Sequence, residues 1–190
     1  MKQLKWLVLL VMIPLLAACG GEEIETNMSE TVQDFSYTNQ AKETVSLGDY
    51  EGQWWVADFI FTNCNTVCPP MTSNMAKVQQ AAKEKELDIQ FVSFSVDPEN
   101  DTPNKLKEFG DQHGADYNNW SFLTGYEFQE IKEFGMKSFK TLIDDIENND
   151  QMLHQTSFYL VNPQGKVVKK YNGIQQEQVE LLISDIEQIQ

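Results

Sequence analysis

Two cysteines at the junction between a strand pattern and a helix pattern are the residues of this chain best able to do chemistry. They stand in the segment Cys64-Asn-Thr-Val-Cys68-Pro-Pro, and the only other cysteine is Cys19. The unpaired amides and the dipole at the start of a helix favour a thiolate over a thiol. Side chains at this spacing on a helix have Cβ atoms about 5–6 Å apart, which is wide for a disulfide unless a turn before Pro69 brings them closer. The pair therefore suits either reversible disulfide chemistry or the binding of a soft metal ion.

A histidine could complete such a metal site, and the chain has two. His113 ends a predicted helix just before Gly114, a pattern typical of a C-terminal cap, and we interpret it as structural. His154 follows a polar loop and precedes an apolar strand pattern. Two thiolates and one imidazole form a ligand set for copper, because sulfur suits Cu(I) and an added nitrogen suits Cu(II). A structural zinc ion would need a fourth protein ligand, and no third cysteine remains in the mature domain to provide one.

The elements that must position these side chains alternate between strand and helix patterns. In chain order the sequence predicts a hairpin over 33–47, a strand over 54–61, helix 70–87, strand 89–96, helix 103–112, strand 120–123, helix 127–134, a hairpin of strands 157–161 and 166–171, and helix 175–190. This order predicts an α/β fold with a central mixed sheet flanked by helices, which is the order of the thioredoxin fold. An acidic insertion at 144–150 precedes the last hairpin, and we interpret it as a solvated loop.

This topology bears directly on His154. In open α/β sheets, ligands bind beyond the carboxyl ends of the strands, where Cys64 follows the strand over 54–61. In a thioredoxin-like fold the loop that enters the strand over 157–161 faces the cysteine loop. We therefore expect His154 to lie close to the two cysteines.

The first 18 residues have the pattern of a secretory signal. Lys2 and Lys5 precede an apolar run that ends in small residues before Cys19. The run is shorter than the ~20 residues needed to span a bilayer. Its end is similar to a bacterial lipobox, in which the cysteine is acylated and becomes the new amino terminus. We expect a lipoprotein signal peptide at 1–18, a lipidated Cys19 with a flexible tether over 19–31, and one domain over 32–190, anchored outside the cytoplasm on the cell membrane.

The charge of the chain excludes several classes of partner and mechanism. Its formal net charge is −15, and every basic residue is a lysine. Nucleic acid is excluded as a partner because its binding needs a basic surface. The absence of arginine excludes any mechanism that needs a guanidinium, including the stabilised thiolate of a peroxiredoxin. We expect the domain to be a monomer.

Three sequence blocks resemble those of the Sco/SenC family. The blocks are Phe61-Thr-x-Cys64-x-x-x-Cys68-Pro-Pro-Met71, Ser95-Val-Asp97-Pro-x-x-Asp101-Thr-Pro103, and His154 ahead of its apolar strand. The likeness extends over essentially the whole mature domain. It implies a thioredoxin-like fold, binding of Cu(I) and Cu(II), and a role in assembling the dinuclear copper centre of cytochrome c oxidase subunit II.

Transferred to this chain, the family pattern makes Cys64 and Cys68 the sulfur ligands and His154 the imidazole ligand. Asp97 lies at the carboxyl end of its predicted strand. It is a candidate to contact the ligand residues without binding the metal itself. The alternative interpretation is an ordinary Asp-Pro turn residue.

Two functions remain open. Our first hypothesis is a membrane-tethered copper chaperone rather than an enzyme with turnover. The second is a thiol–disulfide oxidoreductase that reduces the copper-ligand cysteines of subunit II. A thioredoxin-type reductase would, however, show Cys-x-x-Cys and a proline where Thr156 stands. Both functions use the same two sulfurs, Cys64 and Cys68.

Overall fold

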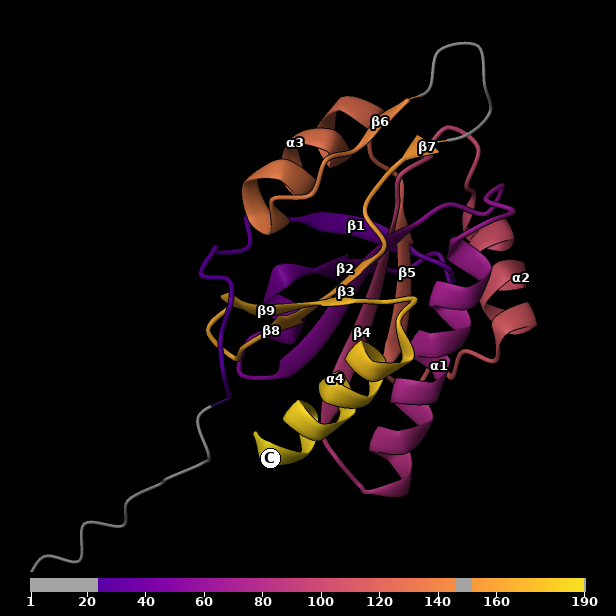
Figure 1. The fold of residues 1–190 in the computed structure, drawn as a ribbon. Coiled ribbons are helices and arrows are strands. Elements are labelled where there is room, and N and C mark those ends of the chain that lie inside the picture. Colours follow the sequence, from indigo (N-terminus) through magenta and orange to yellow (C-terminus); the bar gives the residue numbers. More distant parts are fainter. Residues whose placement is uncertain (1–23, 146–151, 190) are drawn as a thin grey trace, which may run out of the picture.

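A seven-stranded mixed sheet forms the centre of the computed structural model, which describes residues 24–145 and 152–189 (Figure 1). The strands are β1 (Ser36–Asn39), β2 (Thr44–Ser46), β3 (Trp54–Ile60), β4 (Ile89–Ser95), β5 (Trp120–Thr124), β6 (Asp144–Asp145), β7 (Met152–Leu153), β8 (Ser157–Val161) and β9 (Val167–Asn172). The helices are the 3₁₀ turn η1 (Leu47–Tyr50), α1 (Cys68–Glu84), α2 (Pro103–His113), α3 (Phe128–Phe139) and α4 (Gln176–Gln188).

The main sheet has the strand order β2-β1-β5-β4-β3-β8-β9. Strands β3, β4 and β5 are parallel, whereas β1 and β8 run antiparallel to their neighbours. The prediction of an α/β fold with a mixed sheet is therefore confirmed, including the hairpin of β1 and β2 and the hairpin of β8 and β9.

Helices cover both faces of the sheet. Helix α1 packs against α2 and α4 on one face. Helix α3 covers the other face (Figure 1). There Phe139 contacts Phe59 of β3 and Phe94 of β4. Strand β3 lies between β4 and β8, and its residues after Trp54 are all buried. Its apolar run thus forms a strand covered on both faces, as expected.

Helix α3 continues five residues beyond its predicted end. The reason is the packing of its last turn, in which Phe139 is fully buried. Gly135 allows the chain to fold back closely over this turn, since a Cβ there would lie 2.7 Å from the Cδ1 of Ile143. The glycine therefore serves close packing and does not end the helix.

The acidic insertion contains an element that the sequence did not predict. Strands β6 and β7 pair antiparallel, with Asp144 opposite Leu153. Residues 146–150 of the insertion lie outside the described residues.

Residues 24–31 differ from the expected flexible tether. The amides of Asn27 and Met28 both donate to the carbonyl of Val168 at 3.1 Å, and Glu30 accepts from the amide of Val167 at 2.8 Å. The segment thereby satisfies backbone groups of β9, the edge strand of the sheet. The predicted signal peptide and Cys19 lie outside the described residues. Within the ranges described, no helix has the length and apolarity needed to cross a bilayer.

Candidate metal centre

The loop between β3 and α1 places both cysteines at the start of a helix. Strand β3 ends at Ile60, and Cys68 is the first residue of α1. Pro69 and Pro70 follow in the first turn, where a proline removes no hydrogen bond of the helix. The amide of Cys68 donates to the Sγ of Cys64 at 3.3 Å. This hydrogen bond from the helix start favours a thiolate at Cys64, the effect expected of a helix N-terminus.

Asp101 holds the base of this loop. Its carboxylate accepts hydrogen bonds from the amide of Thr62 at 3.1 Å, the hydroxyl of Thr62 at 2.5 Å and the hydroxyl of Ser95 at 2.6 Å. Asp101 thereby joins the ends of β3 and β4, and its side chain is buried. Burial raises the pKa of Asp101, while the donors from Ser95 and Thr62 lower it. The family-like block contains Asp101, but its spacing alone did not reveal this role.

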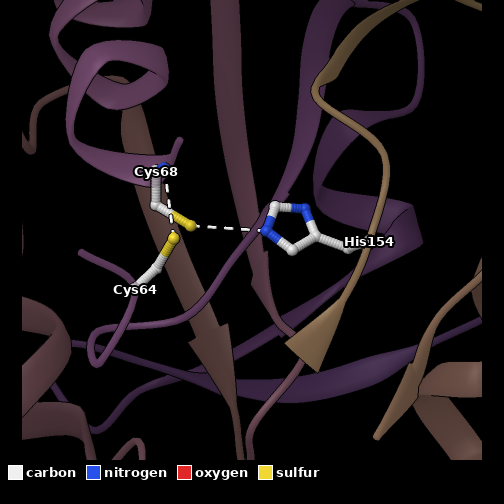
Figure 2. Close-up of side chains that lie close together, drawn as sticks. All are labelled: Cys64, Cys68 and His154. Atoms are coloured by element: carbon white, nitrogen blue, oxygen red, sulfur yellow. Dashed lines mark hydrogen bonds between the residues drawn. The ribbon is translucent and has the colours of Figure 1, made fainter. Parts of the chain in front are cut away.

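His154 reaches the cysteines from the segment between β7 and β8. Figure 2 shows its imidazole directed at Cys68, with Nε2 lying 3.4 Å from Sγ. Its Nδ1 lies 3.2 Å from the carbonyl oxygen of Gln155. Because a carbonyl can only accept, Nδ1 carries a hydrogen, and Nε2 is the ring nitrogen that faces the sulfur. Phe61 packs edge-on against the ring, with centroids 5.7 Å apart.

The structure thus brings together the three predicted ligand residues. Their ligand atoms all lie within 4.8 Å of one another. Cys68 is fully buried and Cys64 is 3% exposed, whereas His154 is half-buried. A cavity of about 700 Å³ opens beside His154, lined in part by Met28 and Lys170. The cavity therefore reaches the histidine, whereas neither cysteine lines it.

The two sulfurs hold their protons unequally. The hydrogen bond from the Cys68 thiol lowers the pKa of Cys64 to about 3, helped by His154 and opposed by burial. That same hydrogen bond, together with burial, raises the pKa of Cys68. The environment of the reduced pair therefore favours a thiolate at Cys64 and a thiol at Cys68. A metal that takes both sulfurs must displace the proton of Cys68.

The donor set fits copper. Two thiolates suit Cu(I), and the imidazole adds a nitrogen that suits Cu(II). No fourth histidine, cysteine or carboxylate joins the cluster among the residues described. A closed structural zinc site would need that fourth ligand.

The other predicted residues lie outside this cluster. The carboxylate of Asp97 accepts from the Nδ2 of Asn100 at 2.9 and 3.1 Å, and no hydrogen bond joins it to the cluster in the described part of the chain. These contacts fit a turn residue, and a role for Asp97 beside the metal stays a prediction. His113 contacts the carbonyl of Phe109 at 2.8 Å ahead of Gly114, which has φ 81°, so the cap interpretation is confirmed.

Sequence reasoning missed Asp58. It is a fully buried acid in β3, its charge raises the pKa of Cys68, and the charge of His154 lowers the pKa of Asp58 itself. The sequence feature that could have revealed it is the single carboxylate inside the apolar run over 54–61.

Comparison with known proteins decides the family. The model of the SCO1/SenC family matches residues 23–190. This chain belongs to the SCO1/SenC family. A Sco relative, the SCO1 protein homolog of Bacillus subtilis strain 168, is 46% identical over 186 residues, which cover 98% of this chain and 96% of that protein.

Two solved Sco structures share the fold. The SCO1/SenC family lipoprotein of Bacillus anthracis strain Ames superposes with a TM-score of 0.80 at 46% identity, covering 88% of this chain and 97% of that one. BsSco, a member of the Sco family of cytochrome c oxidase assembly proteins in which a disulfide switch has been identified, superposes with a TM-score of 0.79 at 47% identity, covering 86% and 95%. The predicted thioredoxin-like fold and Sco/SenC membership are both confirmed.

Proposed function

We propose that this chain is a copper chaperone for cytochrome c oxidase. The observation that carries the proposal is the convergence of Cys64, Cys68 and His154, whose ligand atoms come within 4.8 Å of one another. Membership in the Sco family supports the same conclusion, because BsSco belongs to a family of cytochrome c oxidase assembly proteins. In this proposal the chain receives Cu(I) or Cu(II) and assists assembly of the dinuclear copper centre of subunit II.

The burial of the ligands determines how the cargo would leave. Both sulfurs are buried and His154 is partly exposed. An acceptor would therefore replace His154 first and the thiolates afterwards, by exchange of one ligand at a time. The cavity beside His154 provides room for the incoming ligand.

Anchoring at the membrane is part of the proposal. The lysines, the short apolar run and the small residues before Cys19 form the pattern of a lipoprotein signal. The Bacillus anthracis relative is a lipoprotein. An acylated Cys19 would hold the domain on the extracytoplasmic face of the cell membrane, close to an oxidase embedded in it. Labelling with a radioactive fatty acid should mark the wild-type chain and leave a Cys19→Ala variant unlabelled.

A titration tests the copper site. Anaerobic addition of Cu(II) to the reduced chain should show about one tight site with thiolate-to-copper charge-transfer absorption. Cys64→Ser and Cys68→Ser should each abolish that absorption band. Weak binding without the band, or binding that survives loss of both sulfurs, would overturn the proposal.

A second function is favoured by the state of the cysteines. The pKa of Cys64 is lowered, which favours the thiolate, the form that attacks disulfides. It would attack one sulfur of a target disulfide and form a mixed disulfide. Cys68, after losing its proton, would attack the sulfur of Cys64 and release the target as a dithiol. Two electrons thus pass to the target, and a Cys64–Cys68 disulfide remains.

Deletion of the gene separates the two functions. Loss of oxidase activity that added copper restores supports delivery of copper. Loss that only a small-molecule thiol restores supports reduction of subunit II. Full oxidase assembly by a Cys68→Ser variant would exclude disulfide exchange, because the second attack needs that sulfur.

A further inference from the structure

Asp58 is a carboxylic acid in the middle of the core. It lies on β3 opposite Ser93 of β4. Its neighbour Phe59 points to the face covered by α3, where it contacts Phe139. Side chains alternate along a strand, so Asp58 points to the opposite face, beneath α1. That helix begins with Cys68, one of the proposed copper ligands.

The carboxyl group of Asp58 forms no ion pair with any described residue. Neither oxygen of Asp58 makes a hydrogen bond within the described residues, and the side chain is fully buried. Ser93 comes near enough to influence the carboxyl but does not reach hydrogen-bond geometry. An unpaired charge in the interior is costly, and buried charges normally have a counter-ion or bind a metal.

The two ionisable groups that interact with the charge of Asp58, His154 and Cys68, both belong to the metal centre. Burial raises the pKa of Asp58 to about 7, while Ser93 and the charge of His154 lower it. The pKa of Cys68 is raised by its bond to Cys64, by burial, and further by the charge of Asp58. No lysine is among the groups that set the pKa of Asp58. Besides His154 itself, a cation held by the cysteines and His154 would therefore supply a positive charge to this carboxylate.

We propose that Asp58 sets the preference of the site for Cu(II) over Cu(I), as a buried charge beside the metal and not as a ligand. This inference rests on the proposed copper site. Two thiolates and a neutral imidazole carry two negative charges. Monovalent copper leaves the cluster with one negative charge, which a neighbouring carboxylate repels, whereas divalent copper leaves it neutral. In a medium of low polarity this difference of one charge favours the divalent ion.

The proposal is tested by neutralising Asp58 in the full-length chain. Asp58→Asn keeps the size of the side chain and removes its charge. We expect the affinity for Cu(II), measured by competition with a chelator, to fall by about tenfold or more, and the affinity for Cu(I) to change much less. The matched control is Thr72→Val, which removes another buried and unpartnered polar group from α1 without changing the charge. It should leave both affinities unchanged.

A metal-free measurement distinguishes a buried charge from a structural role. The pKa of Asp58 is about 7 in the folded chain, against about 3.9 in an unfolded one. Ionisation therefore destabilises the fold increasingly as pH rises between these values. Without metal, Asp58→Asn should unfold at a higher temperature than wild type at about pH 8, with the difference vanishing near pH 4. A residue that merely supports packing would instead make the variant less stable at both pH values.

The possible outcomes are distinct. Equal losses of Cu(I) and Cu(II) affinity, or no loss of either, would overturn the role of Asp58. If Asp58→Asn does not fold, Asp58→Ser provides a smaller neutral side chain for which we expect the same change in preference. If wild type binds neither ion through its sulfurs, the proposed function fails, and this inference fails with it.

Discussion

The Sγ of Cys68 and the Nε2 of His154 lie 3.4 Å apart although 86 residues separate them in the chain (Figure 2). The contact joins the first residue of α1 to the segment that enters β8. Strand β8 pairs directly with β3, whose end leads into the cysteine loop. The neighbouring positions of β3 and β8 in the sheet therefore create this contact.

His154→Ala should weaken Cu(II) binding by about tenfold or more, because it removes the only nitrogen ligand of the proposed set. Cu(I) binding should suffer less, since the two thiolates remain. The measurement is a competition titration of each ion under anaerobic conditions.

His113→Ala is the matched control for this substitution. It removes the other histidine of the chain, which caps α2 through the carbonyl of Phe109. It should cost about 0.3–1 kcal/mol of stability and leave copper affinity unchanged. A His154→Ala chain that binds Cu(II) as tightly as the His113→Ala chain would contradict the ligand assignment.

Cys64 should react with alkylating agents at a rate that hardly depends on pH between about pH 5 and pH 8. Its pKa is lowered to about 3, so the thiolate is already formed throughout this range. An ordinary thiol would react about tenfold faster with each added pH unit below its pKa. Mass spectrometry after brief treatment with iodoacetamide should find the label on Cys64 before Cys68. A steep rise with pH, or labelling of Cys68 first, would show that the proton sits on the other sulfur.

The oxidised, reduced and copper-loaded forms should unfold at different temperatures. A metal that binds only the folded reduced chain stabilises it by about 4 kcal/mol at a thousandfold excess over the dissociation constant. The Cys64–Cys68 disulfide closes a loop of a few residues and should add only modest stability over the reduced form. Calorimetry at one pH should therefore find the highest midpoint for the copper-loaded chain. Equal midpoints with and without stoichiometric Cu(II), or full copper binding by the oxidised chain, would contradict this coupling.

Asp101→Asn should destabilise the fold by about 1–3 kcal/mol and loosen the cysteine loop. An amide in this place brings two hydrogens toward Thr62 and Ser95, which are themselves donors to the carboxylate. Chemical denaturation measures the loss, and copper affinity reports on the loop. Asp97→Asn is the control, because the carboxylate of Asp97 accepts from Asn100, a residue of its own turn. A larger loss of copper affinity for Asp97→Asn than for Asp101→Asn would instead assign the supporting role to Asp97.

Local pattern was enough to predict most elements and the cysteine half of the site. The apolar run over 54–61 predicts a strand, and the apolar period after it predicts a helix. The two cysteines before a pair of prolines predict a site at the start of that helix. All three signals involve residues that are close together in the sequence. The end of α3 was predicted wrongly because Phe139 is held by contacts with Phe59 and Tyr159, which come from distant strands. Residues 24–31 have the composition of a linker. Their backbone nevertheless forms hydrogen bonds with the edge strand β9, and composition does not predict that contact.

The sequence by itself determined which atoms this protein can offer: two sulfurs at a helix start, two histidines, no arginine and one acid inside a central strand. Tertiary structure decided which of these atoms meet. It placed His154 rather than His113 against Cys68, used Asp101 to join two strand ends, and left Asp58 buried without a hydrogen bond to any residue that the structure describes. The physical reason is range: periodicity and helix signals act over a few residues, whereas these contacts depend on strand order and on the packing of α1 against the sheet.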